Sequence, residues 1–402
     1  MKNRNYRGFL WHIIFFSFTS TFTEVNTIIP ALILRVGGGA IHVGIVSAIV
    51  IGIPVVTKLF FSSFLSSQRI KKPYLLLGVD SRILALISIS ITLYWYENFS
   101  FTVLILLLYL ELLIFSVGGA FANLPYVYLL GSFKRETRIK FFTRRPIIMS
   151  VGMFLSVFIA RYILSKWEYP TQYVILFALS ASFLLIASLG LRSVKEEPAT
   201  SITKVPALVI IKDIPNLLRK DKNFFSFLIY SNIMGAALAL IPFYIGYAKN
   251  VFIMDSTILG YVLLVQITGM FVASFIFPKL IKQNGFKEVL KFRIIIHFIL
   301  PLLAILIANT GSLLGYLIIF FFIGFALSSR MVSEEAVLIE LSNEDNRVIY
   351  TALACSLNIA IIVAPLVMGV LISILGYTLV FIISALITLI AFPVLRSLKC
   401  AV

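Results

Sequence analysis

Apolar runs recur along the whole chain, and each is about as long as a membrane-spanning helix must be. A helix needs about 20 predominantly apolar residues to cross the hydrocarbon core of a bilayer. Turn-forming or charged residues, such as the glycines at 37–39, separate most of the runs. The predicted spans are residues 9–34, 41–65, 73–95, 101–131, 146–165, 171–191, 223–248, 257–278, 289–308, 311–332, 349–374 and 377–395. We therefore predict an all-α integral membrane protein with twelve transmembrane helices, whose two ends lie on one side.

The composition supports a membrane protein and excludes an ordinary soluble domain. The hydrophobic fraction is 60%, and 13% of the residues are charged, against roughly a quarter in soluble proteins. The first apolar run follows basic residues, as in a signal peptide, but it is too long and lacks a small-x-small cleavage site. We expect residues 1–34 to be retained as the first span. The only cysteines, Cys355 and Cys400, are too few for a disulfide framework or a thiolate metal site, and we predict no cofactor.

The basic residues predict the orientation. The chain has 34 Lys and Arg against 17 Asp and Glu, a formal charge of +17. With the amino terminus in the cytoplasm, most of them fall in inner loops, and the outer loops hold only Arg35, Lys166 and Lys249. We therefore expect a multi-pass protein of the plasma or inner membrane with both termini cytoplasmic. The expected partners are membrane lipids, a small-molecule solute and a proton or another coupling ion, with no nucleic acid, and the chain is expected to act as a monomer.

The longest polar stretch, residues 192–222, divides the predicted spans into six and six. It predicts an N-terminal six-helix bundle at 1–191, a cytoplasmic linker at 192–222 and a C-terminal six-helix bundle at 223–402. A polar loop follows the second span of each half, reading SFLSSQRIKK at 63–72 and PKLIKQNGFK at 278–287. The two halves therefore look like repeats of one pattern.

This organisation resembles the major facilitator superfamily (MFS), whose two halves are parallel repeats. The family's loop motif, Gly-x-x-x-Asp-Arg-x-Gly-Arg-Arg, is degenerate here: the first copy keeps only basic Lys71 and Lys72, and the second keeps Gly285 and Lys287. The glycine ladder of family antiporters is absent from the fifth span, which has Gly152 alone. The resemblance implies the MFS fold and secondary active transport by alternating access.

Three ionisable residues fall between the midplane and the outer third of the predicted bilayer. Glu24 lies roughly 22 Å from the inner edge, Arg161 is at a similar depth, and Glu111 lies about 15 Å from the outer edge. Ser20 and Thr27 share the helical face of Glu24. Charged groups at this depth are costly, so each is a candidate substrate contact, with Glu24 and Glu111 as candidate proton-coupling sites. The alternative is a structural ion pair between Glu111 and Arg161.

The second half contains no acid in the middle of a predicted span, but it offers neutral polar side chains. The candidate substrate contacts are Tyr230, Asn232, Gln266 and Asn358. Hydrogen bonds between helices are an equally good explanation for each of them. This asymmetry assigns proton chemistry to the first half and neutral contacts to the second.

A charged gate is predicted at the inner surface. In the MFS the loop after the second span approaches the inner end of the eleventh span when the cytoplasmic side closes. Here that would bring Arg69, Lys71 and Lys72 towards Glu344 and Asp345. The alternative is that the two acids only complement the amino-terminal dipole of the eleventh helix.

The remaining charged residues within spans are assigned structural roles. Lys58 is expected to extend to the interface, and Asp80 and Arg82, about two turns into the third span, are expected to be structural or part of the inner gate. A lone histidine in a helix usually satisfies a local hydrogen bond, which is the role expected for His12 and His297.

These observations predict a proton-linked transporter of a small organic solute and not an enzyme, with export slightly favoured. Direct ATP drive is excluded because no Walker-type motif is present. Two alternatives remain open. One is an integral membrane enzyme acting on lipids, although the histidines at 12, 42 and 297 are scattered along the chain. The other is a transporter-like sensor without flux, which the degenerate loop motifs permit.

Overall fold

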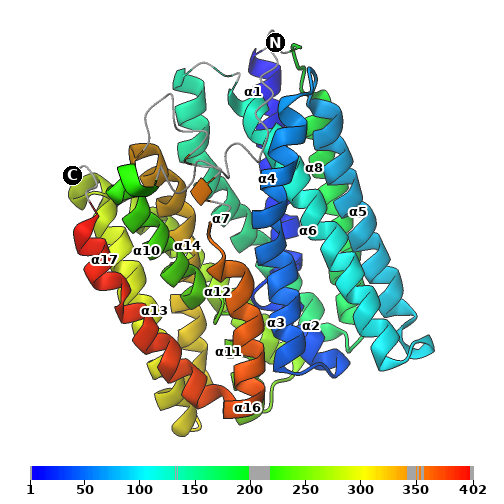
Figure 1. The fold of residues 1–402 in the computed structure, drawn as a ribbon. Coiled ribbons are helices and arrows are strands. Elements are labelled where there is room, and N and C mark those ends of the chain that lie inside the picture. Colours follow the sequence, from blue (N-terminus) through cyan, green and yellow to red (C-terminus); the bar gives the residue numbers. More distant parts are fainter. Residues whose placement is uncertain are drawn as a thin grey trace.

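The structure is a computed structural model that describes residues 2–131, 133, 135–198, 218–341, 350, 353–354 and 357–398. Within these ranges all regular secondary structure is helical (Figure 1). Ten of the described helical segments are long and apolar enough to cross a membrane. The two ends of the chain lie towards the same end of the helical array (Figure 1). The prediction of an all-α membrane protein is therefore confirmed.

The helices of the first half are α1 (Lys2–Phe22), α2 (Ile28–Val36), α3 (Ala40–Ser47), the π-helical turn η1 (Ala48–Gly52), α4 (Ile53–Ser66), α5 (Lys72–Tyr94), the 3₁₀ turn η2 (Tyr96–Asn98), α6 (Phe101–Gly131), α7 (Arg135–Lys166) and α8 (Thr171–Ser193). Those of the second half are α10 (Lys222–Leu238), α11 (Phe243–Val251), α12 (Ser256–Asn284), α13 (Phe286–Asn309), α14 (Leu313–Leu341), α16 (Ala360–Leu389) and α17 (Ala391–Ser397).

Two interruptions of the helices matter for function. The first predicted span is broken between α1 and α2, where residues 23–27 leave the helical path. The second interruption is inside α16, where Gly376 has a φ of 79°. A positive φ is strained for residues with a Cβ, so glycine is favoured at this bend. The bend falls between the predicted eleventh and twelfth spans.

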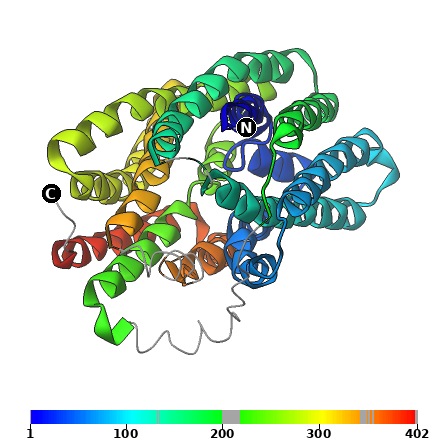
Figure 2. The same ribbon diagram turned by 90° about the horizontal axis from the view of Figure 1, so that it is seen from above.

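Most helix contacts lie within one half of the chain. In the first half α5 packs on α6 and α8, and α1 packs on α7 and α8; in the second, α14 packs on α12 and α13, and α16 on α10 and α13. In the end-on view the blue-to-cyan helices lie on one side and the yellow-to-red helices on the other (Figure 2). The two sets meet chiefly where α7 packs on α12 and α3 packs on α16.

Glycines allow the closest of these contacts. A Cβ on Gly78 of α5 would lie 2.6 Å from the carbonyl oxygen of Gly118 and 2.8 Å from the backbone nitrogen of Ala122, both on α6. Across the halves, a Cβ on Gly369 of α16 would lie 2.7 Å from the carbonyl oxygen of Ala40. In lipid, helices associate through such close packing because there is little hydrophobic force between them.

The substitution Gly78→Val should destabilise the protein, because the obstructing atoms belong to the α6 backbone and cannot rotate away. Overpacking of this kind costs about 1–3 kcal/mol. We expect a lower thermal unfolding temperature for the full-length protein in detergent. Gly39→Ala is the control, since Gly39 has an extended backbone and a Cβ there would meet no atom within 4 Å. Equal unfolding temperatures for both variants would contradict this account.

Candidate functional site

Glu24 lies in the break between α1 and α2 and stabilises it. Its carboxylate accepts two hydrogen bonds from Asn26, one from the backbone N–H at 2.9 Å and one from the side-chain amide at 2.9 Å. The side chain of Glu24 is buried, with an exposed fraction of 6%. A broken helix leaves backbone donors without helical partners, and the carboxylate supplies one of them with an acceptor.

The same break is joined to the second half of the chain. The Thr27 hydroxyl donates a hydrogen bond of 2.5 Å to Oε1 of Gln266 on α12. Two buried atoms in this cluster have no hydrogen-bond partner, Oδ1 of Asn26 and Nε2 of Gln266. A buried polar atom without a partner is costly, so the Asn26 oxygen is available to a ligand, whereas the Gln266 side chain lies beside the Glu24 carboxylate. The structure thus brings together three residues that the sequence predicted, Glu24, Thr27 and Gln266.

Asn26 is a member of this cluster that the sequence analysis did not identify. The predicted site used the face of an uninterrupted helix, on which residues three and four apart are neighbours. Asn26 does not lie on that face with Glu24, and it reaches the carboxylate only because the helix is broken. Ser20, which was predicted, lies within α1 and donates its hydroxyl to the carbonyl of Phe16 at 2.9 Å.

The expected cluster of Glu24, Glu111 and Arg161 does not form. Glu111 on α6 accepts hydrogen bonds from the hydroxyls of Ser88, at 2.6 Å, and Thr92, at 2.7 Å, both on α5.

Arg161 on α7 instead donates to the hydroxyl of Tyr261 on α12 at 2.7 Å, and its guanidinium lies 4.2 Å from the centre of that ring. The alternative ion pair between Glu111 and Arg161 is therefore also absent. Similar depth in the bilayer did not place the two side chains on facing helix surfaces.

Three predicted contacts of the second half make hydrogen bonds to other segments of that half. Tyr230 donates to the carbonyl of Leu290 at 2.9 Å, Asn232 donates to that of Leu357 at 2.9 Å, and Asn358 donates to the hydroxyl of Ser231 at 3.1 Å. These bonds favour the structural alternative for Tyr230 and Asn232. Asn358 keeps a buried Oδ1 without a hydrogen-bond partner.

A cavity of about 240 Å³ lies next to the break, within the first half. Its lining includes Val25, which follows Glu24 in the chain, and Arg82 of α5. The guanidinium carbon of Arg82 lies 4.2 Å from the ring centre of Phe115 and 5.2 Å from that of Phe16. Arg82 was assigned a structural or gating role from the sequence, whereas the structure makes it part of a cavity wall.

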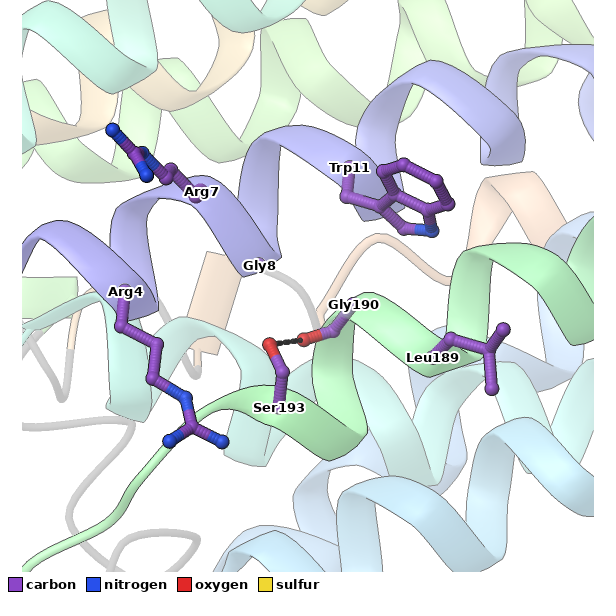
Figure 3. Close-up of a pocket in the computed structure, with 7 residues that line it drawn as sticks. All are labelled: Arg4, Arg7, Gly8, Trp11, Leu189, Gly190 and Ser193. Carbon is purple, nitrogen blue, oxygen red and sulfur yellow. Dashed lines mark hydrogen bonds between the residues drawn. The ribbon is translucent and has the colours of Figure 1, made fainter.

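A larger hollow of about 650 Å³ lies between the first turns of α1 and the last turns of α8. Figure 3 shows Arg4 and Arg7 at one end and Trp11 at the other, with Gly190 and Ser193 on α8. The indole of Trp11 donates to the carbonyl of Ile186 at 2.8 Å and is 44% exposed, as expected for an interfacial tryptophan. This hollow is built by α1 and α8 of the first half alone.

The backbone N–H groups of the two predicted gate lysines donate to an acid other than the predicted ones. The backbone N–H groups of Lys71 and Lys72 donate to the carboxylate of Glu196, at 2.8 Å and 2.6 Å, so this residue after α8 caps the start of α5. Arg69 is exposed. Glu344 and Asp345 lie outside the described residues, so the gate stays a prediction. The side chain of Lys58, predicted to extend to the interface, also lies outside the described part of the structure.

Other charged residues form ion pairs near the end that carries the termini. Asp80 pairs with Arg192 at 2.6 Å at an exposed position. Glu334 lies within α14, beyond the end of the predicted tenth span, and pairs with buried Arg293 at 3.3 Å and with Arg330 at 3.0 Å. These residues therefore have structural partners within their own half.

At the end away from the termini the two halves are joined by polar contacts. Lys249 before the end of α11 donates to the carbonyl of Leu34 on α2 at 2.6 Å, and Gln172 on α8 donates to the hydroxyl of Ser256 on α12 at 2.8 Å. Arg161 and Tyr261 are at the same end. Nearer the middle of the chain's helices, Thr27 and Glu24 in the break make polar contacts with Gln266 on α12. The two halves are thus hydrogen-bonded to each other at the end away from the termini.

Comparison with known proteins identifies the fold. No protein-family model matches the sequence, and no curated protein has a significantly similar sequence. Solved structures do match: a mutant of the nucleoside transporter NupG has a TM-score of 0.67 at 16% identity, covering 98% of this chain and 100% of the other. Another structure of NupG has a TM-score of 0.65 at 15% identity, covering 99% and 100%. This likeness shows that the chain shares the overall fold of these transporter structures along nearly its whole length.

The bond between Thr27 and Gln266 should couple the two residues energetically. Thr27→Val and Gln266→Leu should each lower the thermal unfolding temperature in detergent, and the double variant should lower it by less than the sum. Couplings between polar residues in membrane proteins average about 0.6 kcal/mol. Thr268→Val is the control for Thr27→Val, because Thr268 bonds only within its own helix, to Leu264. Additive effects of the Thr27 and Gln266 substitutions would show that the bond contributes nothing.

Proposed function

We propose that the protein is a secondary active transporter that moves a small organic solute by alternating access. In this proposal residues 1–191 and 223–402 are two six-helix bundles that rock against each other, and residues 192–222 are the linker. The chain crosses the membrane twelve times: α1 and α2 together form the first span, and the bend at Gly376 separates the eleventh span from the twelfth. The match to transporter structures along the whole chain supports this topology.

The observation that carries the proposal is the polar cluster around Glu24. It combines a buried carboxylate, an interrupted helix and a hydrogen bond between the two halves, at residues that an inert helix bundle would fill with apolar side chains. Transporters of several folds place their sites at interrupted helices between two halves. We infer that Glu24, Asn26, Thr27 and Gln266 contact the solute or the coupling ion, with Asn358 as a further contact.

Glu24 is our proposed proton site. Its described hydrogen-bond donors are neutral, and it takes part in no ion pair among the described residues. Protonation would turn one carboxyl oxygen from an acceptor into a donor, which removes a bond to Asn26. The bonds that fix the break would therefore depend on the charge of Glu24, which gives a direct route from proton binding to helix movement. Glu111 stays a weaker candidate, with one buried oxygen that has no partner.

The orientation and the direction of transport follow from the sequence predictions. We propose that both termini are cytoplasmic, that the protein acts as a monomer in the plasma or inner membrane, and that export is slightly favoured. A lipid-modifying enzyme would need clustered catalytic groups. Among the described residues there is no group of three or more His, Cys, Asp or Glu side chains that could hold a metal. A sensor, which would bind the solute without transporting it, is distinguished from a transporter by measuring flux in vesicles.

Proton-linked transport is tested with purified protein in vesicles that contain a defined mixture of small organic solutes. Imposing a pH gradient should change the distribution of at least one solute, measured by mass spectrometry. Glu24→Gln should abolish the dependence on the gradient, because the amide cannot take up a proton. Glu97→Gln is the matched control, since Glu97 lies in the exposed turn η2.

The possible results separate the alternatives. Absence of any redistribution by the wild-type protein would reject the transport proposal, and solute binding without flux would support the sensor. Gradient-driven flux that survives in Glu24→Gln would reject Glu24 as the proton site while leaving transport established.

Alternating access is tested at the end away from the termini. Gln172→Cys together with Ser256→Cys places two thiols where the side chains now meet. A short bis-methanethiosulfonate should join them through two disulfides, with release of methanesulfinate, and stop flux by holding this end closed, and a thiol reductant that cleaves the disulfides should restore flux. Each single variant treated with the same reagent is the control. Flux that continues after complete cross-linking would contradict movement of the two halves at this contact.

A further inference from the structure

Arg82 places an unpaired positive charge deep in the membrane. It lies about 15 Å along α5 from Lys72, close to the middle of a bilayer core about 30 Å thick. No hydrogen bond or ion pair of its guanidinium is present among the described residues, and its Nε is buried without a partner. Basic residues at this depth usually pair with an acid or face a water-filled cavity that serves function.

The acids near Arg82 already have other partners. Asp80, on the same helix, is paired with Arg192, and Glu111 on α6 accepts from hydroxyls of α5. Glu24 accepts from Asn26.

One further guanidinium lies in the same region as Arg82. Arg82 and Arg145 both lie near His12 on α1, a buried imidazole that adds no charge of its own. Arg145, on α7, stacks at 5.6 Å from the ring centre of Tyr126 on α6. Neither Arg82 nor Arg145 has an ion-pair partner among the described residues.

The cavity is shaped to present the guanidinium to a ligand. The rings of Phe16 and Phe115 fix it from the sides. On the α6 wall Gly119 faces the guanidinium, and a Cβ there would lie 3.5 Å from the guanidinium carbon, in van der Waals contact with it. Ser116 and Asn123 add neutral hydrogen-bonding groups to the lining. Arginine offers five N–H donors in a planar fork that matches carboxylate oxygens.

We propose that the transported solute is an organic anion, and that Arg82 binds its carboxylate or similar anionic group in this cavity. This inference rests on the proposed transport function and names the substrate class. A volume of about 240 Å³ suits the charged head of a small solute. The remainder of the solute would extend past Val25 towards Glu24 and Gln266.

The charge preference of the cavity can be measured without knowing the solute. In a full-length background with Cys355→Ser and Cys400→Ser, Asn123→Cys places one thiol in the cavity wall. We expect it to react faster with a sulfonate-bearing methanethiosulfonate than with the trimethylammonium analogue, relative to their rates with a free thiol. Arg82→Gln should reduce this preference about tenfold or more, because it removes the nearest positive charge.

Two controls keep the result specific. Arg192→Gln removes a guanidinium that is paired outside the cavity and should leave the preference unchanged. Arg82→Lys retains the charge and should retain most of the preference. An equal preference in Arg82→Gln and in the parent would overturn the proposal, as would a preference for the cationic reagent in the parent.

A second measurement covers the case in which Arg82→Gln does not fold. With Arg82 intact, benzoate should slow the labelling of Asn123→Cys, and benzamide, which has nearly the same shape and no charge, should not. Equal protection by the two, or by neither, would reject an anion site. Labelling requires no flux, so failure here would leave the transport proposal standing. Conversely, absence of flux would reject transport without altering the measured charge preference.

Discussion

The interruption of the first span, held by the carboxylate of Glu24, is the feature on which the rest of the site depends. An unbroken helix would satisfy its own backbone and would present Glu24 to its neighbours as an isolated charge. The break instead provides donors for that charge through Asn26 and turns Thr27 towards α12. One local departure from helical geometry thus explains why the acid is tolerated in the membrane and how this site is hydrogen-bonded to the second half.

Much of the fold could be predicted from the sequence because lipid constrains it strongly. Every backbone polar group must be satisfied internally, so apolar length alone identifies spanning helices. The bend at Gly376 occurs where the predicted spans divide, since glycine alone tolerates that backbone conformation well. Glu24 was identifiable because charged residues are rare at that depth. The break beside it was not, because no proline or glycine occurs between residues 22 and 28.

The parts of the site that the sequence did not predict depend on tertiary contacts. Glu111 and Arg161 lie at similar depths, yet their partners are on α5 and α12, and depth carries no information about which way a side chain points. Arg82 was assigned to structure or to the inner gate because it lies about two turns into the predicted third span, next to Asp80. The aromatic rings that contact Arg82 belong to Phe16 on α1 and Phe115 on α6. Their position beside Arg82 depends on how the helices pack, so the sequence alone does not predict it.

The two charged centres of the first half suggest how their proposed roles fit together. Arg82 is positive and has no described acidic partner, whereas Glu24 is negative and has only neutral donors. Binding an anion at Arg82 and a proton at Glu24 would neutralise both. Neutralising these two charges lowers the electrostatic cost of excluding water from the cavity, which must occur as access changes sides. When solute and proton are both bound, the charges of Arg82 and Glu24 are both neutralised. The bound state would therefore favour the conformational change that closes the cavity on one side of the membrane and opens it on the other.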